Sequence, residues 1–297
     1  MKNLEEFQRE VGSTGAVAVQ GGQTHWDVGG SLGDGVRLVS PPAGIDSFNP
    51  SEMTVAVNAG TKIEDLNNEL STHGQEVGLE GPKGSTVGGA LVVGRNSIRK
   101  NRIGSIRATL LQAEYINAQG KIIKAGGPTV KNVTGYDLCR LLVGSLGTLG
   151  LIGQVILRTR PLPEENIWLE GEVFPQKVRE TCFRPSSLLW DGRTTFVQLE
   201  GYGLDVNSEA SKLKKLGFSE RGKECPIQIP EFRHPFISDS NLQEGVVDVY
   251  NSIHYCSREP RALEHSEEVL LLGRRMREIF DPERRLNPNR DPYKAGP

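Results

Sequence analysis

A run of seven residues with three evenly spaced glycines, Gly144 to Gly150, constrains this chain more than any other segment. It leads directly into residues 151–157, an apolar and β-branched run of the kind that forms strands. Because glycine has no Cβ, the backbone of such a run can approach another group closely. A second glycine-rich run, Gly81 to Gly89, lies about sixty residues earlier. Two such runs in one chain predict a large ligand that carries phosphate.

The chain has 297 residues, which is long enough for one large or two medium domains with a buried core. Its formal net charge of -2 lacks the strongly basic balance typical of nucleic-acid-binding proteins. No stretch approaches the roughly eighteen apolar residues of a membrane helix, and residues 1–6 lack the apolar region of a signal peptide. We therefore expect a cytoplasmic protein whose four scattered cysteines stay reduced.

Helical and strand patterns alternate without a regular βαβ rhythm, and hairpin signals lie among them, which indicates an α+β architecture. Strands are predicted over residues 14–20, 36–39, 53–58, 106–117, 122–124, 151–159, 168–174 and 194–200. Helices are predicted from Thr61 to Gly74 and over residues 136–143, 208–216 and 263–280. The first of these helices is expected to start with a capping box formed by Thr61 and Glu64. It should turn Ile63, Leu66 and Leu70 inward, and the second helix should turn Leu138, Leu141 and Leu142 inward.

Composition changes after the Pro161-Leu162-Pro163 segment, where glycine clusters become few. We expect a first domain over residues 1–162 and a smaller second domain over residues 163–262. We also expect residues 263–297 to form a C-terminal helix and tail.

Two short segments could bind an anion. Gly21-Gly22-Gln23-Thr24 follows a predicted strand, and a tight turn of this type can point successive N–H groups at one spot. Ser85-Thr86-Val87-Gly88-Gly89 adds two hydroxyls and further bare amides. A diphosphate needs several such donors at once, ideally with a helix N-terminus behind them. The alternatives are a plain hairpin turn for the first segment and a glycine-rich turn between core strands for the second.

Other well-known sites are disfavoured. The 144–150 run lacks the Gly-x-Gly-x-x-Gly spacing and lies between a predicted helix and a strand, which argues against a Rossmann nucleotide site. Residues 217–223 resemble a triphosphate-binding loop, but Glu224 follows where a hydroxyl should hold magnesium. The five histidines show no metal-ligand spacing, so no metal site is predicted. His254-Tyr255 is the pair in the second domain that could face a substrate, and no catalytic base is identified.

Three segments carry a resemblance to a known family. They are Gly84 to Gly94, Arg102 to Arg107, and Gly126 to Gly150, in which Lys131-Asn132-Val133-Thr134-Gly135-Tyr136-Asp137 precedes the glycine run. The endings Phe280-Asp281-Pro282 and Leu286-Asn287-Pro288 belong to the same pattern. The chain resembles the FAD-binding domain of the vanillyl-alcohol oxidase / p-cresol methylhydroxylase (PCMH) superfamily, and within it the E-type subunits of bacterial glycolate oxidase.

The resemblance implies a PCMH-type two-subdomain FAD-binding fold with a reduced α+β cap domain. It also implies that the C-terminal helix and tail, residues 263–297, return to the FAD-binding domain. It implies that the 21–24 turn and the 85–89 loop hold the FAD diphosphate. By carry-over, the cofactor-binding residues are Gly21, Gly22, Gln23, Thr24, Ser85, Thr86, Val87, Gly88, Gly89, Ser105, Ile106, Ile152 and Asn287. Ser105 and Ile106 would lie along the dinucleotide, Ile152 near the adenine and Asn287 near the isoalloxazine. No histidine falls where relatives attach FAD covalently, so we expect non-covalent binding.

The resemblance also implies an activity. A 2-hydroxy acid would give a hydride to the flavin, in a complex with a related D-type flavin subunit and an iron–sulfur F-type subunit, which could place the complex at the inner membrane. The chain departs from the family pattern at Ala108, where relatives often have Asp, and in its short second domain. Two alternatives stay open. One is a non-catalytic interaction subunit, and the other is a reductase resembling enolpyruvyl-glucosamine reductase.

Overall fold

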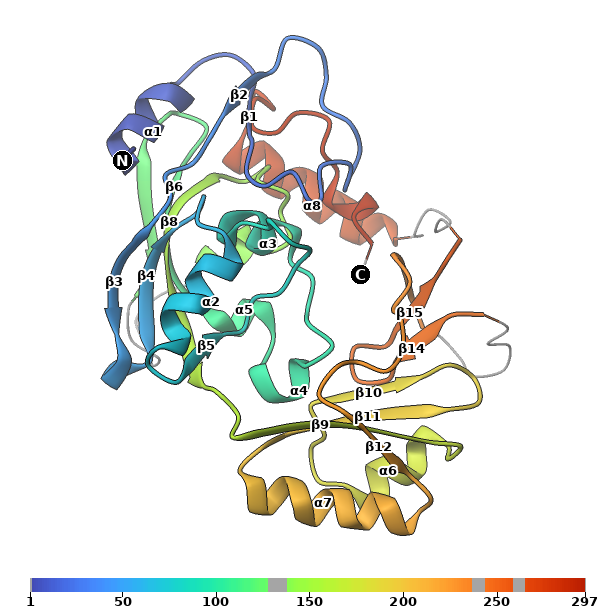
Figure 1. Ribbon diagram of the computed structural model, residues 1–297. Coiled ribbons are helices and arrows are strands. Elements are labelled where there is room, and N and C mark those ends of the chain that lie inside the picture. The colour runs from blue at the N-terminus through green and yellow to red at the C-terminus, as the bar shows by residue number, and fades with distance from the viewer. Residues whose placement is uncertain (1, 128–137, 237–243, 259–264, 297) are drawn as a thin grey trace. The chain divides into compact units, whose positions relative to one another are not determined.

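The computed structural model describes residues 2–127, 138–236, 244–258 and 265–296 (Figure 1). The chain divides into two compact units. The first unit comprises Met1–Arg95, Ser105–Arg160 and Leu263–Ala295, and the second comprises Asn96–Gly104, Pro161–Ala262 and the last two residues. In the described part of the chain, the helices fall short of the length and apolar character needed to cross a bilayer.

The first unit is built around a six-stranded sheet whose central strand is β8 (Leu151–Pro161). This strand pairs antiparallel with both β4 and β6, so the predicted strand over 151–159 is confirmed. The other strands are β3 (Ile45–Asn49), β4 (Thr54–Asn58), β5 (Gln75–Val77), β6 (Leu110–Ile116) and β7 (Ile122–Gly126). Helices α2 (Ile63–Ser71) and α3 (Val87–Val93) contribute buried side chains to the same hydrophobic core.

Helix α2 has the predicted buried face, formed by Ile63, Leu66 and Leu70, but its start differs from the prediction. The N-cap is Lys62, and no side chain caps the helix. The Thr61 hydroxyl instead accepts a hydrogen bond from the Gly44 N–H at 2.8 Å and donates one to the Gly44 carbonyl at 3.1 Å. The predicted capping box is therefore wrong, because the threonine side chain ties down the preceding loop instead.

Two further boundaries differ from the sequence-based expectation. The predicted strand over 106–117 begins with a short helix, α5 (Ile106–Thr109), because the Ser105 hydroxyl caps it by accepting the Ala108 N–H at 3.3 Å. The predicted helix over 136–143 is a 3-10 helix at Leu138–Leu142, and residues 136 and 137 lie outside the described residues. Leu142 is buried as expected, but Leu138 and Leu141 are exposed, because a 3-10 helix presents a different face from an α-helix.

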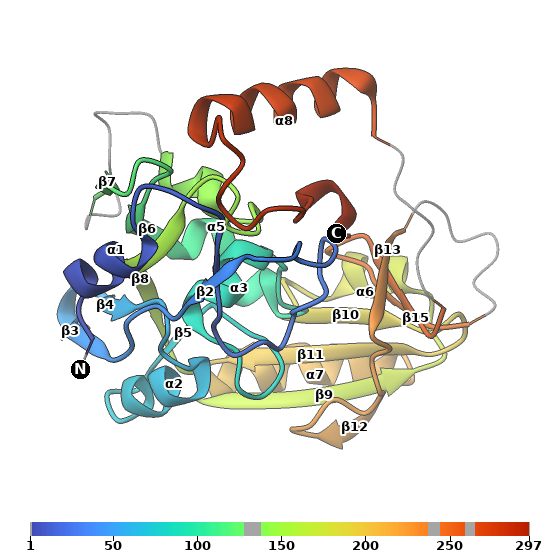
Figure 2. The same ribbon diagram turned by 90° about the horizontal axis from the view of Figure 1, so that it is seen from above.

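The C-terminal tail reaches a small parallel sheet of β1 (Val17–Val19) and β2 (Arg37–Val39), where Leu286 pairs with Val17. Helix α1 (Leu4–Val11) packs there through Phe7 and Val11, and Asn3 and Glu6 form its capping box. Helix α8 (Glu267–Phe280) leads into the tail, and Figure 2 shows it running along the outside of the first unit near that tail. The tail is held by Arg285, which is 4% exposed and donates to carbonyls of two separate segments, residues 11–15 and Ala118.

The second unit is a seven-stranded sheet in the order β12-β9-β11-β10-β14-β15-β13, with α6 and α7 packed on it (Figure 1). Its strands are β9 (Glu165–Gly171), β10 (Ser187–Trp190), β11 (Thr195–Gly201), β12 (Ser219–Gly222), β13 (Phe232–Pro235), β14 (Val246–Asp248) and β15 (Ile253–Cys256). Its helices are α4 (Lys100–Ile103), α6 (Pro175–Thr181) and α7 (Gly203–Lys215). Segment 96–104 joins this unit through the Arg99–Glu200 ion pair, whose atoms lie 2.9 Å apart.

Candidate cofactor-binding site

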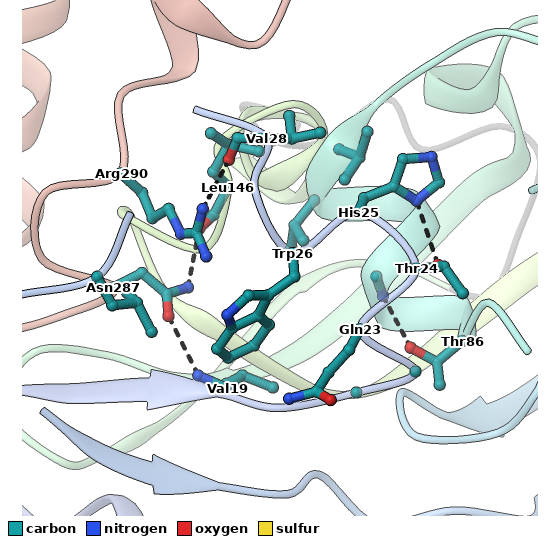
Figure 3. Close-up of a pocket in the computed structure, with 16 residues that line it drawn as sticks. Val19, Gln23, Thr24, His25, Trp26, Val28, Thr86, Leu146, Asn287 and Arg290 are labelled. Atoms are coloured by element: carbon teal, nitrogen blue, oxygen red, sulfur yellow. Dashed lines mark hydrogen bonds between the residues drawn. The ribbon is translucent and has the colours of Figure 1, made fainter. Parts of the chain in front are cut away.

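A cavity opens in the first unit where β1, the start of α3 and the C-terminal tail come together (Figure 3). Its walls come from residues 19–32, from residues 86–93, from Leu146 of the glycine run, and from Asn287 and Arg290 of the tail. A second hollow shares several of these walls and extends between Ala59 and the residues 147–152. Segments from the beginning, middle and end of the chain therefore build one connected site.

The 21–24 turn supplies free hydrogen-bond donors to this cavity. The backbone N–H groups of Gly21, Gly22, Gln23 and Thr24 donate to no acceptor in the described part of the chain. A Cβ on Gly21 would lie 2.6 Å from the Thr86 hydroxyl oxygen, and a Cβ on Gly22 would overlap the Gly84 carbonyl. The two glycines thus let the turn lie directly against the 84–86 loop. Four successive donors without an acceptor form a surface that suits an anion.

The predicted 85–89 loop contributes less than its sequence indicates. The Val87 N–H donates to the Thr61 carbonyl at 2.9 Å, and the Gly88 N–H donates to the Ala59 carbonyl at 2.8 Å. The Thr86 hydroxyl caps α3 by accepting the Gly89 N–H at 3.2 Å. Thr86 and Gly89 line both parts of the site and Gly88 lines the second, but the first N–H groups of α3 already have acceptors within the protein.

Asn287 links the tail to two other segments. Its side-chain oxygen accepts the Val19 N–H at 3.1 Å, and its side-chain nitrogen donates to the Leu146 carbonyl at 2.8 Å. A Cβ on Gly147 would overlap that nitrogen, and a Cβ on Gly150 would overlap the Tyr115 ring. The glycines of the 144–150 run therefore make room for the protein's own groups, and this packing shapes the wall that the run presents to the site.

Several predicted residues lie elsewhere. Ser85 lines a separate shallow hollow beside α2, where its hydroxyl lies 2.8 Å from that of Thr24. Ser105 caps α5 and Ile106 is buried, and neither lines the cavity or the second hollow. Val87 is fully buried, whereas Ile152 lines the second hollow.

His254 belongs to the second unit, and its Nε2 lies 2.7 Å from the Glu244 carbonyl oxygen. The Lys131–Asp137 motif lies outside the described residues.

Sequence reasoning missed Arg290 and Trp26. Arg290 is 7% exposed, and its Nη1 donates to the carbonyls of Val28, at 3.1 Å, and Gly30. Its guanidinium carbon lies 5.4 Å from the centre of the Trp26 ring. Burial lowers the pKa of Arg290, and the negative charge of Asp27 partly offsets this effect. Among the described residues that line the cavity there is no carboxylate, so Arg290 gives it a positive character. The sequence signal that could have identified Arg290 was its position two residues after the Asn287-Pro288 pair.

Comparisons with known proteins also indicate an FAD-binding domain. Residues 5–126 match a family model described as an FAD binding domain. The chain is 27% identical over 245 residues to glycolate oxidase subunit GlcE of Escherichia coli (strain K12), covering 79% of this chain and 69% of that protein. It is 42% identical over 138 residues to glycolate oxidase subunit GlcD of Bacillus subtilis (strain 168), covering 42% of this chain and 29% of that protein. It is 30% identical over 177 residues to D-2-hydroxyglutarate dehydrogenase of Xanthomonas citri pv. viticola, covering 56% and 37%.

A solved structure of alkyldihydroxyacetonephosphate synthase superposes with a TM-score of 0.72 at 15% identity, covering 96% of this chain and 74% of that one. This likeness concerns the fold. The chain spans 69% of the GlcE subunit but only 37% of the hydroxyglutarate dehydrogenase. The predicted mixed helix and sheet fold is confirmed, and the predicted resemblance is supported by the match of residues 5–126 to the FAD binding domain model and by the similarity to GlcE.

Proposed function

We propose that this chain is an FAD-binding subunit of a glycolate-oxidase-like 2-hydroxy acid dehydrogenase. One observation carries the proposal: four consecutive residues, 21–24, line a cavity in the first unit, and their backbone N–H groups have no acceptor in the described part of the chain. A diphosphate offers the acceptors that these donors lack. When bound, FAD would accept the hydride of the substrate, while the protein positions it and tunes its electronics.

Different residues of this chain would have different roles in binding FAD. The turn at 21–24, with the Thr86 hydroxyl as a further donor, would bind the diphosphate through hydrogen bonds and without a covalent link, and Gly89 would line the same cavity. The hollow beside Ile152 is lined by small and apolar residues, which suits one of the two aromatic ends of the dinucleotide. Asn287 would act as a positioning residue, because both ends of its amide already bind protein groups. A base must take the hydroxyl proton of the substrate, and we assign none on this chain.

The partners are inferred from the relatives. Both an E-type and a D-type glycolate oxidase subunit match this chain, which supports a complex in which a D-type flavin subunit stands beside it. An iron–sulfur F-type subunit would then carry electrons onward. A 2-hydroxy acid is the substrate class that the matching dehydrogenases support.

One observation favours a second candidate function, a flavin subunit that does not itself oxidise the substrate. The matching dehydrogenases are covered over only 20% to 39% of their length. The similarity to those enzymes therefore supports the cofactor domain, whereas the site where each binds its hydroxy acid has no demonstrated counterpart here.

The proposal is tested by three measurements in turn: the visible absorbance of bound FAD, the quenching of tryptophan emission by FAD, and the reduction of the flavin by substrate. The purified 297-residue chain should retain or take up FAD and turn yellow, and FAD should quench its tryptophan emission. Because Trp26 lines the cavity while Trp168 and Trp190 are buried in the second unit, Trp26→Phe should lose most of the quenching. Failure to bind FAD, alone or with its natural partners, refutes the proposal.

Anaerobic glycolate or lactate then separates the two candidates. Bleaching of the flavin in the isolated chain supports a catalytic subunit. Bleaching that requires the partner subunits supports the second candidate, and rapid bleaching by NADPH alone would instead point to a reductase.

A further inference from the structure

We propose that Arg290 is the cationic residue that binds the diphosphate of FAD and so helps this site select a dinucleotide over an uncharged flavin. The inference rests on the proposed function and adds to it a recognition residue. Arg290 lies outside the two glycine-rich segments to which the motifs assigned the diphosphate.

The first argument is the hydrogen bonding of Arg290. Its side chain is 7% exposed, and both of its bonds to protein, to the Val28 and Gly30 carbonyls, leave from Nη1. Within the described part of the chain, Nε and Nη2 have no acceptor, yet they are not among the atoms sealed away from solvent. A nearly buried guanidinium that lines a cavity with two unused N–H groups is equipped to bind something in that cavity.

The second argument is rigidity. The two carbonyls hold Nη1 of the guanidinium, and the Trp26 ring centre lies 5.4 Å from its central carbon. Figure 3 shows Arg290 between Val28 and Trp26. A cation beside an aromatic face gains a modest stabilisation and loses rotational freedom. The remaining edge is therefore held in place before any ligand arrives. A fixed guanidinium edge matches a pair of phosphate oxygens better than a flexible ammonium group does.

The third argument is charge. The described residues that line the cavity include no carboxylate, and the nearby Asp27 is exposed to solvent. Burying a cation without a paired anion carries a desolvation penalty, and a permanent negative charge on a ligand would offset this penalty. In FAD the diphosphate carries such charge, whereas the oxidised isoalloxazine is neutral. The same cavity offers the free N–H groups of the 21–24 turn, which attract the same anion.

The test compares Arg290→Gln with Arg275→Gln, which removes an equal charge from an exposed position on α8. FAD binding is measured by ultrafiltration and visible absorbance, since emission from Trp26 would itself respond to the change. We expect the Kd for FAD to rise about ten- to a hundredfold in Arg290→Gln, because a charge-assisted hydrogen bond is lost. Riboflavin, which has no phosphate, should bind both variants and the unsubstituted chain equally, and ADP should compete with FAD less well in Arg290→Gln.

Each outcome decides the matter. An unchanged Kd in Arg290→Gln overturns the proposal. A raised Kd together with an altered spectrum of bound FAD and weaker riboflavin binding also overturns it, because Arg290 would then act on the flavin ring.

Should Arg290→Gln fail to fold, two other measurements replace it. Arg290→Lys, which keeps the charge, should bind FAD more tightly than Arg290→Met, and FAD binding to the unsubstituted chain should weaken with added KCl while riboflavin binding does not. The absence of both effects refutes the assignment. If the unsubstituted chain binds no FAD at all, the proposed function fails, which is a distinct result.

Discussion

Replacing Gly147 with alanine tests how the glycine run builds the site. Gly147 has a φ of +70°, where a Cβ costs about 1 kcal/mol, and its Cβ would also overlap the side-chain nitrogen of Asn287. Displacing that amide breaks its bonds to Leu146 and Val19, worth about 1 kcal/mol each, and leaves their buried backbone groups without partners. We expect Gly147→Ala to lower the free energy of unfolding by about 3 kcal/mol in total.

The same run offers a matched control. Gly144 has a φ of +81°, and nothing lies within 4 Å of the position its Cβ would take. Gly144→Ala should therefore lose only the backbone contribution of about 1 kcal/mol. Urea unfolding followed by circular dichroism measures both variants, and FAD affinity is measured in parallel. We expect only Gly147→Ala to weaken FAD binding strongly, because only it moves Asn287.

A double-mutant cycle isolates the cause. In an Asn287→Ala background the displaced nitrogen is gone, so adding Gly147→Ala should cost only about the 1 kcal/mol of the backbone strain. Equal stability losses for Gly147→Ala and Gly144→Ala, or the same cost of Gly147→Ala with and without Asn287, would refute the reasoning.

Three other predictions follow from buried or reactive groups. Arg285→Leu should lower the free energy of unfolding by at least about 3 kcal/mol in urea titrations, since carbonyls of residues 11–15 and of Ala118 lose their donor, whereas Arg275→Leu should change it little. Burial raises the pKa of Asp248, so the native state holds this proton more tightly and stability should fall as the pH rises above about 4; Asp248→Asn should flatten that part of the pH profile of urea unfolding, and an unchanged slope contradicts the assignment. Cys225 is the exposed thiol among the four cysteines, so Cys225→Ser should abolish the fast phase of labelling by a disulfide reagent.

Local patterns identified the elements whose contacts are local. The spacing of Ile63, Leu66 and Leu70 correctly predicted the buried face of α2, and the β-branched run after Gly150 correctly predicted β8. The capping prediction for Thr61 was wrong because a threonine hydroxyl can hydrogen-bond either to a helix N-terminus or to a neighbouring loop. Here the fold brings Gly44 next to this hydroxyl, and the hydroxyl binds Gly44 instead of the helix.

The site itself depends on pairings that no local pattern encodes. Asn287 meets Leu146 across 141 residues of sequence, and Arg290 meets Val28 across 262. The motif around Asn287 could be recognised, but its hydrogen bonds could not. Arg290 looked like an ordinary charged residue in a polar tail, since the expected return of this tail to the first domain did not specify that it pairs with β1 and buries Arg290.

These pairings also explain why stability and cofactor affinity must be measured together in this protein. Asn287 uses its whole amide to join β1 to the glycine run, so its loss should reduce both quantities at once. Arg290 donates to protein carbonyls through only one of its nitrogens, and its other two nitrogens have no acceptor in the described part of the chain. A residue that builds the cavity wall and a residue that recognises the ligand should therefore differ in one measurable ratio. This ratio is the loss of FAD-binding free energy divided by the loss of free energy of unfolding. This ratio should be high for Arg290 and low for Asn287, although the two residues lie three positions apart on the same tail.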